Sequence, residues 1–220
     1  MSLRVGLTGG LASGKSTVAK MFASRGAYIM YADQVGHDAM KPGEPAYSEI
    51  VRRFGDSIVN PDQTINRKKL ADLAFGSGRI EELNRIVHPA VRERMERWMR
   101  EASEFDPRAI LVVEAALILE AGFGKYFDKL VVVTSKPEQK LERFAGRMPA
   151  TEGNVHEQRL QTLRDAERRI GAQLSDEEKI AAADYVIDNS GSLADTERQV
   201  NAICKELQQL ASLRKQASKS

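Results

Sequence analysis

The chain has 220 residues, of which 42% are hydrophobic, and a formal net charge of +2 at pH 7. This length suffices for one packed core with a small additional lobe, and the balanced charge provides no basic field for nucleic acid. A lone cysteine, Cys204, cannot form an internal disulfide, and the apolar runs are shorter than the roughly 20 residues of a membrane-spanning helix. With no secretory signal pattern, we expect a cytoplasmic protein, a monomer or at most a weak oligomer, that binds neither nucleic acid nor membrane.

Five short apolar runs predict the buried strands of a parallel sheet. They are rich in valine and isoleucine and lie at residues 3–8, 27–31, 109–114, 129–134 and 184–188. Helical patterns separate them, which is typical of repeated strand–helix–strand units. The fold class is therefore predicted to be α/β, with a five-stranded parallel sheet.

Two long segments without strand patterns interrupt this alternation. Residues 33–106 carry only helical patterns and are predicted to form a helical insertion, in which Pro89 should kink or divide the helix at 79–105. Residues 137–173 are strongly charged and mostly helical in pattern, which is typical of a mobile lid. The small, polar and basic tail at 214–220 is predicted to be disordered.

Residues 9–17 read GGLASGKST and match the pattern G-x-x-x-x-G-K-[ST], between a strand pattern and a helix pattern. Such glycines let successive backbone N–H groups point at phosphate oxygens, and the helix N-terminus adds partial positive charge. Lys15 would bridge the β- and γ-phosphates of a nucleoside triphosphate, and the Ser16 hydroxyl would ligate Mg²⁺. The alternative, a glycine-rich turn with an incidental lysine, is disfavoured because motif and context agree. The residues predicted to bind the nucleotide here are Gly10, Ala12, Ser13, Gly14, Lys15, Ser16 and Thr17.

The rest of the sequence favours a small-molecule kinase over other proteins with this loop. The guanine-reading pattern N-K-x-D of the usual GTPases is missing, and the length leaves little room for motor machinery. A small-molecule kinase needs an acceptor lobe, a base near the γ-phosphate and a cationic lid. The predicted domains are a P-loop core at 1–32, 107–136 and 174–213, an acceptor domain at 33–106 and a lid at 137–173.

Asp33 is the candidate base. It lies two residues beyond the second predicted strand, at the carboxyl edge of the sheet, where ligands of open α/β folds bind. There it would accept the proton of the acceptor hydroxyl or orient that hydroxyl. The alternative is that Asp33 only caps the helix beginning at QVGHDAM.

Three further charged residues have a functional and a structural interpretation. Glu114 ends the third predicted strand and could act near the metal like a Walker-B acid, or it caps or pairs at the sheet edge. Arg143 and Arg147 lie four residues apart on one helical face and could neutralise charge on the transferred group. Alternatively, the two arginines are solvated or paired with Glu138 and Glu142.

Several motifs along the chain resemble those of the dephospho-CoA kinase family. They are GLTGGLASGKSTVA, ADQVGHDAM, LNRIVHPAVR, LILEAG, ERFAGR and RRIGAQLSDEEKIAAADYVIDNSGS, in family order from residue 5 to about 200. The resemblance implies ATP-dependent phosphorylation of the 3'-hydroxyl of the ribose in dephospho-CoA, which yields CoA and ADP in the last step of CoA biosynthesis. It also implies a P-loop core, a helical acceptor domain and a lid.

The resemblance also implies roles for single residues. Asp33 takes the position of the family's catalytic carboxylate, acting with Lys15, and Arg143 or Arg147 takes that of its lid arginine. The acceptor side would involve Thr8, Asp33, His37, Arg67 and His88, although a lone helical histidine is more often structural. Asn189 and Gly191 lie where the family's chain passes the ATP base, and Ser16 and Glu114 would serve Mg²⁺.

Three features depart from the family pattern. Tyr31 stands where members usually have the first aspartate of D-A-D, so that carboxylate is not required here. Glu114 and Ala116 replace an aspartate and a proline, and residues 148–165 lengthen the lid. Two alternatives stay open: a kinase of another small acceptor, such as a nucleoside monophosphate or a sugar acid, and a regulatory nucleotide-binding protein without chemistry.

Overall fold

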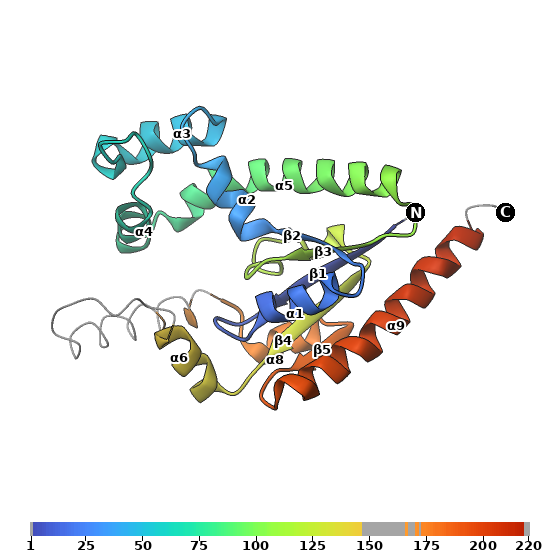
Figure 1. The fold of residues 1–220 in the computed structure, drawn as a ribbon. Coiled ribbons are helices and arrows are strands. Elements are labelled where there is room, and N and C mark those ends of the chain that lie inside the picture. Colours follow the sequence, from blue (N-terminus) through green and yellow to red (C-terminus); the bar gives the residue numbers. More distant parts are fainter. Residues whose placement is uncertain (1, 147–165, 167–169, 172, 218–220) are drawn as a thin grey trace. The chain divides into compact units, whose positions relative to one another are not determined.

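The computed structural model (Figure 1) describes residues 2–146, 166, 170–171 and 173–217. The chain forms two compact units, one made of Met1–Met30 with Ala102–Ser220 and the other of Tyr31–Glu101. The predicted lid segment, apart from its first helix and a few later residues, lies outside the described part. Each unit is built around its own hydrophobic cluster.

The first unit is built on a five-stranded sheet with the strand order β2-β3-β1-β4-β5. The strands are β1 (Leu3–Gly9), β2 (Tyr28–Tyr31), β3 (Ile110–Glu114), β4 (Lys129–Thr134) and β5 (Tyr185–Asp188). β1 pairs in parallel with β3 and β4, and β4 pairs in parallel with β5. The predicted α/β class is confirmed, and each strand lies within one residue of its predicted bounds. Because the strands are parallel, the loops that follow them meet at one edge.

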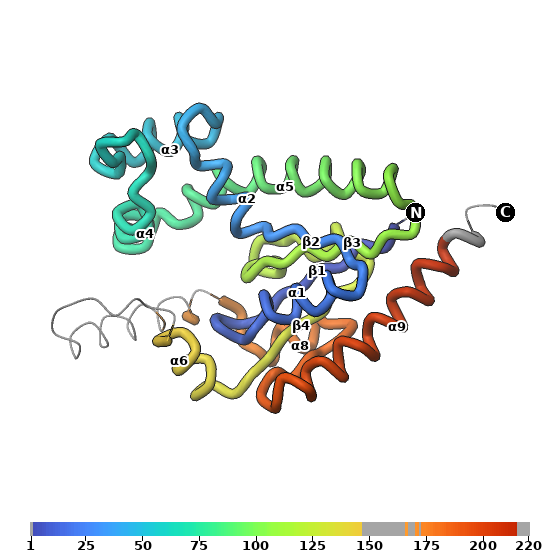
Figure 2. Tube along the Cα trace, in the orientation of Figure 1, coloured from blue at the N-terminus to red at the C-terminus, as the bar shows by residue number. Residues whose placement is uncertain are grey.

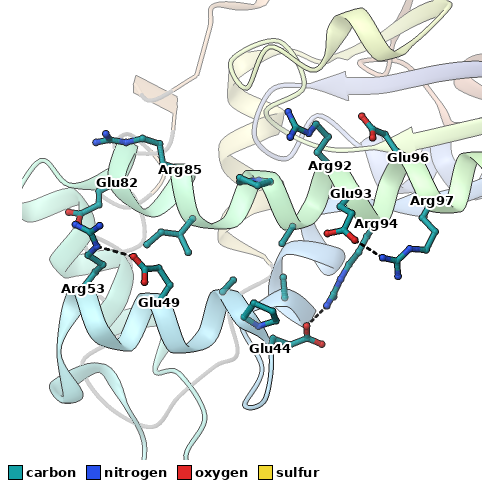
Figure 3. Close-up of a pocket in the computed structure, with 16 residues that line it drawn as sticks. Glu44, Glu49, Arg53, Glu82, Arg85, Arg92, Glu93, Arg94, Glu96 and Arg97 are labelled. Carbon is teal, nitrogen blue, oxygen red and sulfur yellow. Dashed lines mark hydrogen bonds and ion pairs between the residues drawn. The ribbon is translucent and has the colours of Figure 1, made fainter.

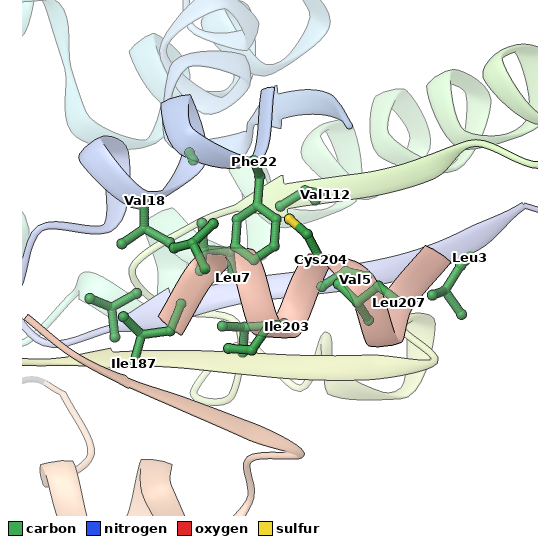
Figure 4. Packing of buried hydrophobic residues seen from close by; sticks show 14 of the residues in the cluster. Leu3, Val5, Leu7, Val18, Phe22, Val112, Ile187, Ile203, Cys204 and Leu207 are labelled. Carbon is green, nitrogen blue, oxygen red and sulfur yellow. The ribbon is translucent and has the colours of Figure 1, made fainter. Parts of the chain in front are cut away.

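The helices of this unit are α1 (Lys15–Ala23), α6 (Pro137–Ala145), α8 (Asp176–Ala181) and α9 (Leu193–Ala217), with a short 3₁₀ turn η2 (Gly124–Tyr126) before β4. Of these helices, α1, α8 and α9 contact the strands, whereas Phe144 of α6 packs against Ala12 in the loop that follows β1. Figure 2 traces the chain from β1 through the loop at residues 9–14 into α1 and on to the edge strand β2. Val18 and Phe22 of α1 and Leu207 of α9 are buried against β1 (Figure 4). Burial of apolar surface in this cluster stabilises the packing of α1 and α9 against β1. The loop at residues 9–14 joins β1 to α1, so this packing fixes both of its ends.

Cys204 belongs to the same cluster on α9, where it is a buried free thiol. Burial raises its pKa to about 11, because the thiolate would lose its hydration. The thiol therefore acts as a small apolar side chain in the core.

The C-terminal tail differs from its prediction. We expected disorder from residue 214, but α9 continues to Ala217. Ala211 is buried near the end of the helix, and Arg214 Nη1 lies 2.6 Å from Asp128 Oδ2. These tertiary contacts stabilise a helical end whose local sequence is polar.

The second unit is helical. It contains α2 (Ala32–Ala39), α3 (Pro45–Phe54), η1 (Asp56–Ile58), α4 (Arg67–Gly76) and most of α5 (Ile80–Phe105). Ile50, Phe54 and Leu70 are among the buried residues of its core. The Asn66 side chain caps α4 by accepting a hydrogen bond from the backbone N–H of Lys69.

Pro89 does not divide α5, which runs through it as one helix of 26 residues. Proline removes a single backbone donor, and Pro89 itself is exposed. The next turns are anchored by the buried side chains of Val91, Met95 and Met99. Their burial outweighs the lost hydrogen bond, so the helix continues. In the described part of the chain, no helix is long and apolar enough to cross a membrane.

Candidate active site

The loop between β1 and α1 has a backbone shape that requires glycine at two positions. Gly9 has φ 152° and Gly14 has φ 102°, and both values lie in the region that other residues rarely adopt. A Cβ atom at Gly9 would collide with the carbonyl oxygen of Val133, and one at Gly14 with the side-chain amide of Asn189. Ala12 also has a positive φ, of 54°. The two motif glycines are thus explained by conformation and by close packing together.

Lys15 is the first residue of α1, and its ammonium is fixed over this loop. Its Nζ donates to the carbonyl oxygens of Gly9 and Gly10, each at 3.0 Å. The side chain is buried, whereas Ser16 and Thr17 in the first turn of α1 are exposed. A nine-residue helix that begins behind a glycine loop with a held lysine is suited to bind phosphate.

Asn189 connects this loop to the end of β5. Its Nδ2 donates to the carbonyl oxygen of Ser13 at 2.8 Å, and its Oδ1 accepts from Thr196 Oγ1 at 2.8 Å. The side chain is buried, so its amide supports the loop from the interior of the first unit. Contact of Asn189 and the exposed Gly191 with the ATP base stays a prediction. The sequence does not predict the role of Thr196, because no local pattern marks a helical threonine as the partner of an amide seven residues earlier.

Arg143 lies on α6, and its side chain extends to the end of the loop at Gly14. Its Nη2 donates to the carbonyl oxygen of Asn189 at 2.9 Å. Its Nη1 is buried, has no hydrogen-bond partner among the described residues, and would lie 3.9 Å from a Cβ atom at Gly14. Within the described residues, no ion pair joins Arg143 to Glu138 or Glu142, so that alternative is wrong for Arg143. Arg147 lies outside the described residues.

Two more predicted residues lie on the strands beside the loop. Glu114 ends β3 in register with Leu7 of β1, and its side chain is buried. Thr8 is fully buried, and its Oγ1 donates to the carbonyl oxygen of Ala116 at 3.3 Å. The structure thus places Glu114 and Thr8 at the carboxyl ends of neighbouring strands, where β1 leads into the loop.

The second unit holds the remaining predicted residues. Asp33 is an exposed residue in the first turn of α2, and the N-cap of that helix is Tyr31, with no side-chain cap bond. The interpretation of Asp33 as a helix cap is therefore wrong. Burial lowers the pKa of His37, the nearby positive charge of Arg67 lowers it further, and Asp33 and Asp38 oppose both effects.

These electrostatic effects show that Asp33, His37 and Arg67 share one neighbourhood. His88 on α5 is half buried, and this burial lowers its pKa as well. Both histidines are therefore more readily neutral than a free imidazole.

The second unit also has a groove of about 910 Å³ between α3 and α5 (Figure 3). Ion pairs between arginine and glutamate cross or line it: Arg94–Glu44 at 2.5 Å, Arg97–Glu93 at 2.6 Å and Arg53–Glu82 at 3.6 Å. None of the predicted acceptor residues is among those that line it. Because its charges are largely paired with one another, the groove provides no candidate site.

Carboxylate and hydroxyl oxygens near the loop could serve a magnesium ion. Among the described residues, no group of three or more His, Cys, Asp or Glu side chains could hold a metal ion. Mg²⁺ in kinases needs no such group, because it takes one or two protein oxygens together with water and substrate phosphates. The exposed Ser16 and the carboxylate of Glu114 fit this donor set.

Comparison with known proteins identifies the family. The solved structure of TT1252 from Thermus thermophilus matches with a TM-score of 0.71 and 30% identity, covering 94% of this chain and 98% of that one. The structure of a dephospho-CoA kinase from Campylobacter jejuni has the same fold, with a TM-score of 0.67 and 24% identity over 95% of this chain and 98% of that one. A dephospho-CoA kinase of Aquifex aeolicus is 40% identical over 205 residues, which cover 93% of this chain and 97% of that protein. The family model described as dephospho-CoA kinase matches residues 3–195. The chain therefore belongs to the dephospho-CoA kinase family.

Proposed function

We propose that this enzyme transfers the γ-phosphoryl group of ATP to the 3'-hydroxyl of the ribose in dephospho-CoA, giving CoA and ADP in the last step of CoA biosynthesis. The observation that carries the proposal is the loop at residues 9–17, in which Lys15 is held by the carbonyls of Gly9 and Gly10. The family membership of the chain supplies the acceptor.

In this proposal, the first unit binds ATP. The backbone N–H groups of the loop and the N-terminus of α1 surround the phosphates. Lys15 bridges the β- and γ-phosphates from its position over the loop. Asn189 and Gly191 border the base, and the P-loop core comprises the segments 1–32, 107–136 and 174–213.

The second unit supplies the acceptor side, through the predicted domain 33–106. Asp33 accepts the proton of the ribose hydroxyl or orients it, and its exposure on the first turn of α2 leaves the carboxylate accessible for this role. Arg67 contributes positive charge for the anionic groups of the acceptor, and the lowered pKa keeps His37 neutral for hydrogen bonding. His88 completes the proposed acceptor contacts of the second unit, and Thr8 of the first unit is the remaining proposed acceptor residue.

Mg²⁺ would be held by Ser16 and Glu114, whose oxygens are of the kind that this ion prefers. When bound, it neutralises charge on the phosphates. Glu114 is buried at the end of β3, so its carboxylate is kept at the sheet edge beside the loop. The longer glutamate side chain in place of aspartate is compatible with contact through water.

Arg143 is the lid arginine that the described residues support best. Its buried Nη1 lies near the loop at Gly14 and has no hydrogen-bond partner in the described part of the chain, so an anion there would satisfy this donor. Arg147 shares this proposed role, and the lid is assigned to residues 137–173. We further propose a cytoplasmic location and a monomer or weak oligomer.

The test is ADP release from the purified enzyme with Mg·ATP, with and without dephospho-CoA. Adenosine monophosphate, cytidine monophosphate, shikimate and gluconate serve as alternative acceptors. Release that depends on dephospho-CoA alone supports the proposal, and equal release with another acceptor contradicts it. Bound ATP without acceptor-dependent release would indicate a regulatory protein.

A further inference from the structure

Gly10, the second glycine of the loop, is covered by a charged pair. Unlike Gly9 and Gly14, it does not have a positive φ, so its backbone conformation does not require glycine. A Cβ atom at Gly10 would lie 3.0 Å from Lys140 Nζ and 3.0 Å from Asp176 Oδ1. A side chain at this position would displace the ends of Lys140 and Asp176 by a few tenths of an ångström, so these two charged groups lie directly against Gly10.

The two side chains come from different helices and form an ion pair. Lys140 lies in the middle of α6, and Asp176 is the first residue of α8. Their side chains are only 12% and 29% exposed. Charges withdrawn from water to this degree interact more strongly than a surface pair, and loss of one partner leaves the other desolvated.

The residue beneath this pair also holds the lysine of the loop. The carbonyl oxygen of Gly10 accepts a hydrogen bond from Lys15 Nζ at 3.0 Å. Any shift of Gly10 therefore shifts one of the two carbonyls that position the Lys15 ammonium. Lys140 and Asp176 thus lie against the residue whose carbonyl oxygen accepts from Lys15.

The same helix contacts the loop at its other end. Arg143 lies three residues after Lys140, on the same face of α6. Its guanidinium lies close to Gly14 and donates to the carbonyl oxygen of Asn189. α6 therefore contacts the loop at Gly10 through Lys140 and near Gly14 through Arg143, so a movement of α6 is transmitted to both ends.

We propose that the Lys140–Asp176 pair is a positioning element of the nucleotide site. It holds Gly10 so that Lys15 is presented to the phosphates, and it joins α6 and α8 to the loop. The inference rests on the proposed role of residues 9–17 in binding ATP. All the residues concerned belong to the first unit, so the effect is local to that unit.

The experiment measures the Kd for Mg·ATP by isothermal titration calorimetry, together with the melting temperature. Lys140→Met and Asp176→Asn are each expected to weaken ATP binding about 10-fold. The double variant should bind no more weakly than either single variant, because both changes break one pair. The KM for dephospho-CoA should change little, because the second unit is not altered.

Lys129→Met is the matched control. Lys129 Nζ lies 2.7 Å from Asp184 Oδ1, and the two side chains are 32% and 33% exposed, so this pair also joins separate segments of the first unit. It lies at the start of β4, at the opposite edge of the parallel sheet from the loop. This variant should lower the melting temperature as much as Lys140→Met while leaving ATP affinity unchanged.

Failure of the inference and failure of the proposed nucleotide site give different results. If Lys15→Ala abolishes ATP binding while Lys140→Met and Asp176→Asn bind like Lys129→Met, the pair is only structural and the inference is wrong. If Lys15→Ala binds ATP like the wild type, the nucleotide site itself is wrong. Should Lys140→Met fail to fold, the isosteric Asp176→Asn carries the test, and unchanged affinity in that variant overturns the inference.

Discussion

Asn189 Nδ2 donates to the carbonyl oxygen of Ser13 at 2.8 Å, and this bond joins the end of β5 to the phosphate-binding loop across 176 residues of sequence. The same side chain accepts from Thr196, so both its polar groups are paired in the interior. Buried groups paired in this way specify one position of the loop, because any shift leaves a donor or an acceptor unsatisfied.

Asn189→Ala should lower the free energy of unfolding by about 2 kcal/mol, because the carbonyl of Ser13 and the hydroxyl of Thr196 each lose a buried partner. It should also weaken ATP binding, since the loop loses its support. Urea denaturation and calorimetry measure the two effects. Gln209→Ala, on the exposed face of α9, is the control and should change neither quantity.

Gly14→Ala should abolish ATP binding. A methyl group there meets the amide of Asn189 and must also adopt a φ of 102°. Gly26→Ala isolates the second effect, because Gly26 has φ 87° but nothing lies within 4 Å of its Cβ position. The control should lose about 1 kcal/mol of stability from backbone strain and retain ATP affinity. Equal affinities for the two variants would show that packing at Gly14 is unimportant.

Asp33→Asn should lower kcat by about 10²- to 10⁴-fold, the usual contribution of a general base, with ATP affinity nearly unchanged. The matched control is Asp38→Asn on the same helix, where the native carboxylate pairs with Lys41 at 2.6 Å. Steady-state kinetics with dephospho-CoA measure kcat, and ATP titrations measure the affinity for ATP. Near-normal turnover of Asp33→Asn would remove Asp33 from the mechanism.

The lowered pKa of His37 predicts a dependence of stability on pH. The unfolded chain takes up the proton near the ordinary value of 6.5, whereas the folded chain does so only at lower pH. The unfolded state therefore binds more protons as the pH falls below 6.5, and the stabilisation present above that value is lost on the way through the folded pKa.

His37→Gln should reduce this loss of stability between about pH 7.5 and 5.5, measured by urea denaturation at each pH. The pKa of His88 is also lowered, so the dependence should be reduced but not eliminated. Arg67→Met should reduce it partly, because the arginine contributes to the shift in the pKa of His37. An unchanged pH profile in His37→Gln would contradict the assignment.

The sequence by itself determined the fold class, the five strands, the phosphate-binding loop and the family. These features are local: the apolar runs are continuous, and residues 9–17 carry the whole loop motif. The same local reasoning erred where packing opposed it. Pro89 does not divide α5, although a kink there stays a prediction, and α9 extends beyond residue 214, because buried side chains and an ion pair stabilise these helices.

Only the tertiary structure decided what holds the loop in place. Asn189 under Ser13, Lys140 and Asp176 over Gly10, and Arg143 beside Gly14 are contacts between residues more than 100 positions apart. Sequence patterns report the preferences of neighbouring residues, whereas these contacts arise from the order of strands in the sheet. Because the parallel strands end at one edge, the segments that follow β1, β4 and β5 meet there.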